Sequence, residues 1–351
     1  MIRLNLSIAM YAFPRARLGA MRSNLISSDD FNALIDADNL EDILSLLKIS
    51  SYGDEMSRLS STNPLEIENV LRRSLLIDYK KLSVSLYGFG KIFINRVSKK
   101  FEVQVLKSAI GEKVSGSEAQ ISEVTPFGSI EESLIERIRR SESHEELAEV
   151  LRPTEYYPIF QNALSEVKDN GNPFTLVSGI DKYVYDRISE KLKAVHGLDK
   201  RISRLLIGTE IDFKNIMLAL RCREMEDEDV EKLFINYRYM IDDISLKTLK
   251  SEGPEAFTQE NFPYSQVVGN SVDSYKKDMS LLPIETALEN HLMHLNIIAL
   301  TGFPFQLGAV IAYLNMKENE IKNLIIILRG KKEGLEREDI ENLLIFPSNN
   351  R

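Results

Sequence analysis

The segment EIKNLIIILRGKK, residues 320–332, decides how the fold of this chain is interpreted. Five consecutive apolar residues, Leu324 to Leu328, would leave a helix of this sequence without a polar face there. A helix that is apolar all round must be buried on every side. Asn323 precedes the apolar run and Arg329 closes it. The segment therefore predicts a buried helix that carries polar side chains at both ends of its apolar stretch.

The same phrase occurs three times in the chain. The copies are EVQVLKSAIG at 102–111, DFKNIMLALR at 212–221 and EIKNLIIILR at 320–329. The second and third agree at Lys, Asn, Leu and Arg, whereas the first has Val105 and Gly111 in place of Asn and Arg. The copies start 110 and then 108 residues apart, and this regular spacing indicates an internal repeat.

A second phrase supports the repeat. DNLEDILSLLKISSYG at 38–53 and ESHEELAEVLRPTEYY at 142–157 both begin with acidic residues and space their apolar residues as in a helix. Each then has a basic residue followed four positions later by a tyrosine, Tyr52 or Tyr156. PEAFTQENFPYS at 254–265 is a weaker candidate for the third copy.

A fainter third phrase completes the pattern. PLEIENVLRRSL at 64–75 and LPIETALENHL at 282–292 both put a proline before an amphipathic helix, and SGIDKYVYDRIS at 178–189 takes the middle place. Helix starts are expected at Ser27–Asp29 and at Ser141–Glu142. Period-two strand patterns are scarce. We therefore predict an all-α fold of three similar helical-bundle domains, 1–115, 116–228 and 229–351, in a pseudo-threefold cluster or an arc.

Composition narrows the function. The net charge of −9 argues against a nucleic-acid or anionic-membrane binder as the default, although it leaves room for a local basic patch. The single cysteine, Cys222, excludes an intrachain disulfide and fits a reducing compartment. No apolar run is long enough for a transmembrane helix. The N-terminus has no clean cleavage site, so we expect it to belong to the mature protein and not to a signal peptide.

The polar residues of the repeated phrase have two interpretations. Asp212, Asn215 and Arg221, like Glu320, Asn323 and Arg329, fit a buried helix whose acid lies near its N-terminus and whose arginine lies near its C-terminus. In the structural interpretation, the asparagine bonds to a neighbouring loop. In the functional interpretation, the arginines reach a cavity and contact a partner.

The N-terminal segment offers a similar choice. Tyr11, Arg15, Arg17, Met21 and Arg22 form a basic, amphipathic segment. It is either a solvated helix face or an interface helix near lipid headgroups or a partner's loops.

Catalytic chemistry finds little support. His291 and His294 share a helix face, but no third metal ligand is suggested. The segment GFGK at 88–91 lacks the length and the Ser or Thr of a phosphate loop. Cys222 has no evident histidine partner. We expect no catalytic residue, cofactor or metal, and the chain is not expected to be an enzyme.

The segment YAFPRARLGAMRSNLIS at 11–27, the 38–53 phrase and the triplicated motif together resemble the C subunit of archaeal and bacterial V/A-type rotary ATPases, whose eukaryotic counterpart is the d subunit of the vacuolar proton pump. The resemblance covers essentially the whole chain. It implies three similar all-helical domains in a funnel on the cytoplasmic face of the membrane. The expected role is non-catalytic: the protein joins the central-stalk subunits (D/F type) to the membrane proteolipid ring, with no nucleic acid and only indirect membrane association.

The alternative is a helical-repeat scaffold that binds soluble protein partners. The resemblance does not distinguish proton from sodium transport, or synthase from pump.

Overall fold

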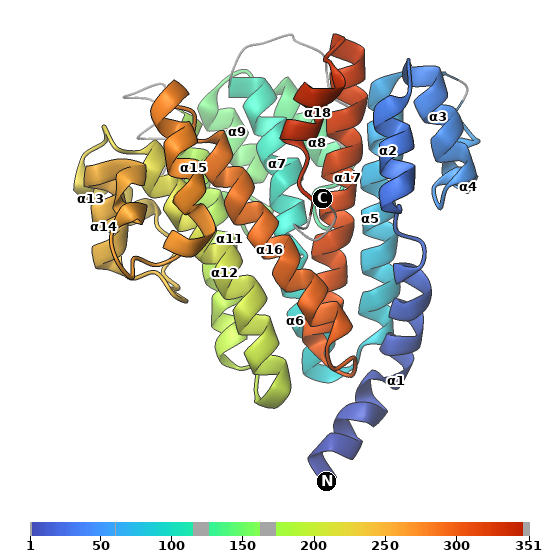
Figure 1. Ribbon diagram of the computed structural model, residues 1–351, viewed down its shortest axis with the longest axis horizontal. Helices are drawn as coiled ribbons and strands as arrows, with labels where there is room; N and C mark the ends of the chain where they lie inside the picture. The colour runs from blue at the N-terminus through green and yellow to red at the C-terminus, as the bar shows by residue number, and fades with distance from the viewer. Residues whose placement is uncertain (1, 60, 115–125, 162–172, 347–351) are drawn as a thin grey trace. The chain divides into compact units, whose positions relative to one another are not determined.

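Every regular element that the structure describes is a helix (Figure 1). The computed structural model describes residues 2–59, 61–114, 126–161 and 173–346. Within these ranges the only β pairing is an isolated bridge between Phe127 and Ile130. The all-α prediction is confirmed. None of the described helices is long and apolar enough to cross a membrane.

The contacts divide the chain into two compact units. The first contains Met1–Lys91, Val195–Arg223 and Arg238–Arg351, and the second contains Ile92–Ala194 and Glu224–Tyr237. The helices of the first unit are α1 (Ile2–Arg22), α2 (Ser28–Asp36), α3 (Leu40–Ile49), α4 (Gly53–Met56), α5 (Pro64–Ser85), α12 (Gly197–Arg221), α14 (Asp243–Glu252), the 3₁₀ helix η1 (Gly253–Thr258), α15 (Ser265–Asp278), α16 (Leu282–Thr301), α17 (Leu307–Glu333) and α18 (Arg337–Leu343). Those of the second are α7 (Lys99–Val114), α8 (Glu132–Arg140), α9 (His144–Leu151), α11 (Pro173–Lys193) and α13 (Asp227–Leu233), while α6 (Gly88–Val97) begins in the first unit and ends in the second. The predicted boundaries at 115/116 and 228/229 stay a prediction.

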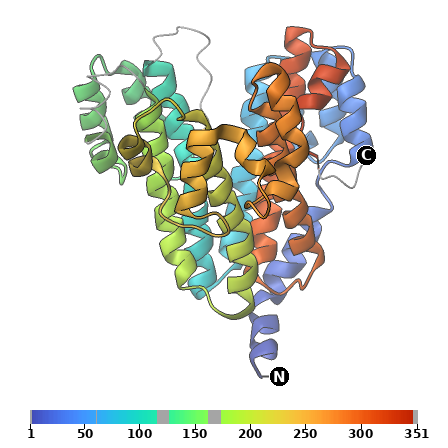
Figure 2. The same cartoon turned by 60° about the vertical axis from the view of Figure 1, so that its left-hand side comes forward.

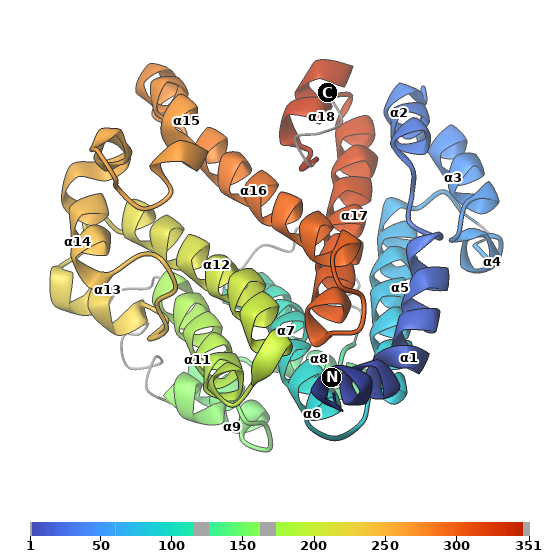
Figure 3. The same ribbon diagram turned by 60° about the horizontal axis from the view of Figure 1, so that its bottom comes forward.

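Helix α17 is the core of the first unit. It packs against α5, α12 and α16 and also contacts α1, α3 and α18 (Figures 1 and 3). Leu324, Ile327 and Leu328 are at most 2% exposed, which confirms the buried helix predicted from 320–332. Burial on several sides at once is possible because its apolar residues are not confined to one stripe.

The position of the acidic residues within these helices differs from the expectation. Glu320 lies in the middle of α17 and Asp212 lies within α12, so neither is near a helix N-terminus. The reason is that the apolar pattern continues upstream, for example through 307–314, and carries the helix several turns further back. The helix dipole therefore does not explain these acids, because its effect is confined to the first turn.

Helices from the N-terminal and C-terminal parts of the sequence pack together in the first unit. Helix α3 contacts α17, and α2 contacts α18, so helices from the two ends of the sequence lie side by side (Figure 2). Phe31 and Phe346 stack edge to face with ring centroids 5.3 Å apart.

Of the two helix starts predicted from the sequence, the structure confirms one and corrects the other. Ser27 caps α2 in a reciprocal capping box with Asp30, as predicted. The second predicted start, Ser141–Glu142, is wrong by two residues, because Ser143 is the N-cap of α9. Ser141 instead ends α8, and its hydroxyl donates to the carbonyl of Ile138 at 2.7 Å.

Candidate functional site: three tyrosine–carboxylate clusters

The acid that opens each copy of the repeated motif accepts a hydrogen bond from a tyrosine hydroxyl. The pairs are Tyr52 with Glu320 at 2.5 Å, Tyr156 with Glu102 at 2.8 Å, and Tyr264 with Asp212 at 2.7 Å. Each motif thus pairs with the tyrosine segment of the next repeat along the chain: motif 102–111 with segment 142–157, and motif 212–221 with segment 254–265. Motif 320–329 pairs with the first segment, 38–53. We name the three sites by their acids: the Glu320, Glu102 and Asp212 clusters.

The Glu320 cluster contains a complete internal ion pair. The Lys317 ammonium lies 2.7 Å from both the Glu320 carboxylate and the Tyr52 oxygen, and 4.1 Å from the centroid of the Tyr52 ring. The second carboxylate oxygen accepts from the Ile26 amide at 2.6 Å. Burial, together with the Glu320 charge, raises the pKa of Tyr52 well above its usual value, so the hydroxyl keeps its proton.

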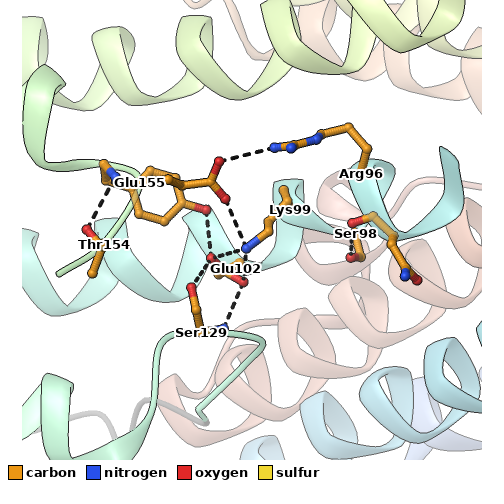
Figure 4. A network of polar contacts seen from close by, with 9 residues as sticks. Arg96, Ser98, Lys99, Glu102, Ser129, Thr154 and Glu155 are labelled. Atoms are coloured by element: carbon orange, nitrogen blue, oxygen red, sulfur yellow. Dashed lines mark hydrogen bonds and ion pairs between the residues drawn. The ribbon is translucent and has the colours of Figure 1, made fainter. Parts of the chain in front are cut away.

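The Glu102 cluster in the second unit has the same composition (Figure 4). Lys99 lies three residues before Glu102 and bonds both of its oxygens, at 2.8 and 2.9 Å. Ser129 donates through its amide at 3.0 Å and its hydroxyl at 2.7 Å. Glu155 extends the network by accepting from Lys99 at 3.0 Å and Arg96 at 3.1 Å. Partial burial raises the pKa of Glu155, but these two cations outweigh it, and the net pKa is lowered.

The Asp212 cluster has no lysine at the corresponding position, which is Thr209. Asp212 instead accepts three successive backbone amides, from Tyr239 at 3.0 Å, Met240 at 2.7 Å and Ile241 at 3.1 Å. Burial still raises the pKa of Asp212 above its usual value and outweighs these hydrogen bonds, each of which lowers it. Tyr264 comes from the 254–265 segment, and it takes the place of Tyr52 and Tyr156.

A second set of contacts follows the same order. In each, a basic residue of a motif copy pairs with an acid on the long helix of the next repeat. The pairs are Lys107 with Asp181 at 2.8 Å, Arg221 with Glu285 at 2.6 Å, and Arg329 with Glu68 through two bonds of 2.8 Å. The first motif lacks the arginine because Gly111 replaces it, and Lys107 serves instead from within the same helix. Comparison of the motifs did not predict the role of Lys107, because it lies four residues before Gly111, the position that aligns with Arg221 and Arg329.

Comparison with known proteins identifies a family over most of the chain, and it is the family that the sequence resembles. The model of the ATP synthase (C/AC39) subunit family matches residues 14–343. The chain belongs to this family. It is similar to the C subunit of the A-type ATP synthase of Methanocaldococcus jannaschii, with 27% identity over 98% of this chain and 88% of the relative. The corresponding protein of Methanococcoides burtonii is 26% identical over 97% and 95%, and that of Halorubrum lacusprofundi is 27% identical over 94% and 96%.

The family is a structural component of the synthase and not a catalytic one. The polar groups of the three clusters fit that description, because they bond to one another. A pocket of about 200 Å³ lies beside the Glu320 cluster, and its walls include Tyr52, Lys317, Tyr313 and Asp78. There the Tyr313 hydroxyl donates to Asp78 at 2.5 Å. Burial raises the pKa of the Cys222 thiol to about 11, which keeps it protonated at neutral pH.

The predicted asparagines are buried. Asn323 donates to the Ile345 carbonyl at 2.9 Å and accepts from the Ile345 amide at 3.1 Å, so its amide group reproduces a backbone pairing. Asn215 is 0% exposed. The bonds of Asn323 agree with the structural interpretation of this position, in which the asparagine fastens a neighbouring segment.

The predicted residues of the N-terminal segment lie on α1. The Tyr11 hydroxyl donates to Asp199 at 2.7 Å, and the same carboxylate accepts from the Leu307 amide at 2.6 Å. Arg17 donates to the Lys81 carbonyl at 2.6 Å, while Arg15 is half-buried. These contacts fasten α1 to α5, α12 and α17. Contact of Tyr11, Arg15 or Arg17 with the stalk or the ring stays a prediction.

Proposed function

We propose that this chain is the non-catalytic central-stalk subunit of a V/A-type rotary ATPase. In this role it couples the central rotor shaft to the membrane proteolipid ring, for proton or sodium transport linked to ATP synthesis or hydrolysis. Its partners are then the D/F-type stalk subunits and the ring, on the cytoplasmic face of the membrane. The family match over residues 14–343 and the names of the relatives support this proposal.

The observation that carries the proposal is the closed order of the contacts between repeats. A part that transmits torque must resist deformation, and buried, fully bonded polar groups fix neighbouring elements in one arrangement. Each motif helix is bonded to the next repeat by a tyrosine and an ion pair, and the third is bonded to the first. The bond of the first motif lies within the second unit, and the bonds of the other two motifs lie within the first unit. The pseudo-threefold, funnel-like arrangement of domains 1–115, 116–228 and 229–351 is part of this proposal.

The first test is a detergent co-purification. The chain is tagged at its C-terminus, membranes are solubilised, and the captured proteins are identified by mass spectrometry. The proposal expects a small, very hydrophobic proteolipid together with coiled-coil stalk proteins. Capture of soluble proteins alone, with the tag absent from the membrane fraction, would favour a helical scaffold and reject the coupling role.

A second test concerns coupling itself. In membranes that carry the assembled complex, Tyr52→Phe removes one bond between repeats, and we expect fewer ions pumped per ATP hydrolysed. Tyr157→Phe is the matched control, because it removes the same hydroxyl from a partly exposed tyrosine that bonds none of the three acids. An unchanged pumping ratio in Tyr52→Phe, with the complex intact, would contradict the role of these bonds in coupling.

A further inference from the structure

One end of the first unit gathers three segments that are far apart in sequence: α1, residues 79–91 at the end of α5 and just after it, and the start of α17. We call this region the α1 end, and Figure 3 turns it toward the viewer. The Tyr11 hydroxyl lies beside Gly90 and bonds Asp199, which also accepts from the Leu307 amide. The bonds to Asp199 of α12 connect α1 to the start of α17, and Gly90 lies close to Tyr11 and Leu307. Side chains on the three segments therefore belong to one surface region.

Large apolar side chains are exposed at the α1 end. They are Met10 at 46%, Phe13 at 54%, Val84 at 62%, Tyr87 at 70% and Phe89 at 38%. Met10, Phe13 and Arg17 follow one stripe of α1, adjacent to the stripe of Tyr11, Pro14 and Leu18 that is buried. Single exposed apolar residues are ordinary, but several on adjoining elements mark an interaction surface.

The charge of the α1 end is opposite to that of the whole protein. The sequence has a net charge of −9, yet residues 1–28, 79–91 and 290–317 contain no Asp or Glu. Two acids lie close to this region. Asp199 is bonded by Tyr11 and Leu307, and Asp78, 3.7 Å from the Lys81 ammonium, is bonded by the Tyr313 hydroxyl. The basic side chains include Arg15, Arg17, Lys80, Lys81 and Lys91, and the Arg17 guanidinium lies 4.9 Å from the centroid of the Phe13 ring.

We propose that the α1 end binds directly to the surface of a bilayer that contains anionic phospholipid. Exposed aromatic and aliphatic side chains insert at the boundary between headgroups and acyl chains, while lysine and arginine reach the phosphates. A cation close to an anionic leaflet is attracted over about a Debye length. Few acids oppose this attraction here, because Asp199 and Asp78 are already bonded within the protein. This contact adds to the proposed function, because association through the ring alone requires no lipid.

The test uses the purified full chain and vesicles of phosphatidylcholine with or without phosphatidylglycerol, separated by flotation. We expect binding to vesicles with phosphatidylglycerol, little binding to pure phosphatidylcholine, and a decrease as salt rises. The double variant Lys80→Glu with Lys91→Glu is expected to weaken binding at least about 25-fold. Each lost cation is expected to reduce the affinity roughly fivefold. Phe13→Ser with Tyr87→Ser is expected to abolish flotation at the same lipid concentration.

Matched controls come from other surfaces of the same unit. Lys276→Glu with Lys277→Glu changes the same charge on α15, and Ile49→Ser with Ile244→Ser removes apolar side chains that are 84% and 76% exposed. Both are expected to float like the unmodified chain, and circular dichroism verifies that each variant is folded. Equal binding by all variants would overturn the proposal.

Two other outcomes separate this inference from the proposed function. Absence of flotation, combined with capture of the proteolipid ring in detergent, overturns lipid contact and leaves the coupling role standing. Salt-sensitive flotation that the Lys80 and Lys91 variants lose supports lipid contact even where no ring or stalk protein co-purifies.

Discussion

The Glu320 and Asp212 clusters occupy equivalent places in two repeats, yet they stabilise a buried carboxylate in different ways. Glu320 has a buried lysine, Lys317, within 2.7 Å, together with one backbone amide. Asp212 has no such lysine and accepts three consecutive backbone amides. The shorter aspartate needs a loop that approaches closely, whereas the longer glutamate reaches a side-chain cation. The comparison teaches that the repeat preserves the tyrosine-to-acid bond and lets the other donors vary.

The largest expected effect tests the ion pair of the Glu320 cluster. Glu320→Ala leaves the Lys317 ammonium, which is 5% exposed, without its counter-charge. Breaking a buried pair from one side costs about 3–5 kcal/mol of the free energy of unfolding. The loss is measured by urea unfolding. The double variant Lys317→Met with Glu320→Met is expected to recover most of it, because no unpaired charge remains. A double variant no more stable than the single one would refute this account.

Asp212→Ala tests the cluster that lacks a lysine. Three backbone amides, of which that of Ile241 makes a buried bond, and the Tyr264 hydroxyl lose their acceptor. We expect a cost of about 3 kcal/mol after water replaces part of the bonding. No single side-chain change should restore it, because most of the donors belong to the backbone. The specific measurement is amide hydrogen exchange at Met240 and Ile241, which should accelerate more than at Leu249 in α14. Uniform acceleration across the unit would indicate global destabilisation instead.

The sequence predicted the repeat but not how the repeats connect. The apolar run from Leu324 to Leu328 required burial, and the near-equal spacing of the three motifs predicted equivalent helices. The tyrosines were noted only as part of a phrase. Their partners lie 54 residues away for Tyr156 and 268 for Tyr52, and a pattern of local periods carries no information on such pairings. The loop amides that bind Asp212 left no signal, because a backbone donor is the same at almost every residue.

Removing a tyrosine hydroxyl sharpens the comparison further. We expect Tyr52→Phe to cost about 2 kcal/mol and Tyr264→Phe about 1.5 kcal/mol, as for hydrogen bonds to charged groups. Tyr52 should cost more, because its oxygen also accepts from Lys317. The control Tyr87→Phe should stay within about 0.5 kcal/mol, since its side chain is exposed. Urea unfolding measures the loss of unfolding free energy in each variant. A larger loss in Tyr264→Phe than in Tyr52→Phe would contradict the extra contribution of Lys317.

The ion pairs at the motif ends should have smaller effects. Arg329→Ala removes two bonds to Glu68, whose side chain is only 7% exposed, and we expect a loss of about 1–2 kcal/mol. Arg221 and Glu285 are 48% and 36% exposed, so Arg221→Ala should cost about 0.2–1 kcal/mol. Raising the salt concentration should reduce the difference in unfolding free energy between Arg221→Ala and the unmodified protein, because salt screens this exposed ion pair. Equal losses for the two variants would mean that burial of the acid does not decide the cost.

The smallest effect concerns two acids that share one loop. Asp212 accepts amides from residues 239–241, and its pKa is raised because burial outweighs those bonds. Asp242 follows directly, caps α14 by accepting from the Ser245 amide at 2.8 Å, and has a lowered pKa chiefly because of that bond. Folding therefore favours the protonated form of Asp212 and the charged form of Asp242. The contribution of Asp212 to stability is present at low pH and lost as the pH rises above its usual value of 3.8, whereas that of Asp242 is lost as the pH falls below it.

NMR of the carboxyl carbons between pH 2 and 7 should show a higher pKa for Asp212 than for Asp242. The first is expected above the usual aspartate pKa and the second below it. Asp242→Asn is the matched control, because asparagine is an equally good N-cap and should leave the Asp212 titration in place. The reverse order of the two midpoints would show that three backbone amides outweigh burial at Asp212. In that case the loop amides alone would stabilise the charged carboxylate of Asp212, without the lysine that the Glu320 cluster contains.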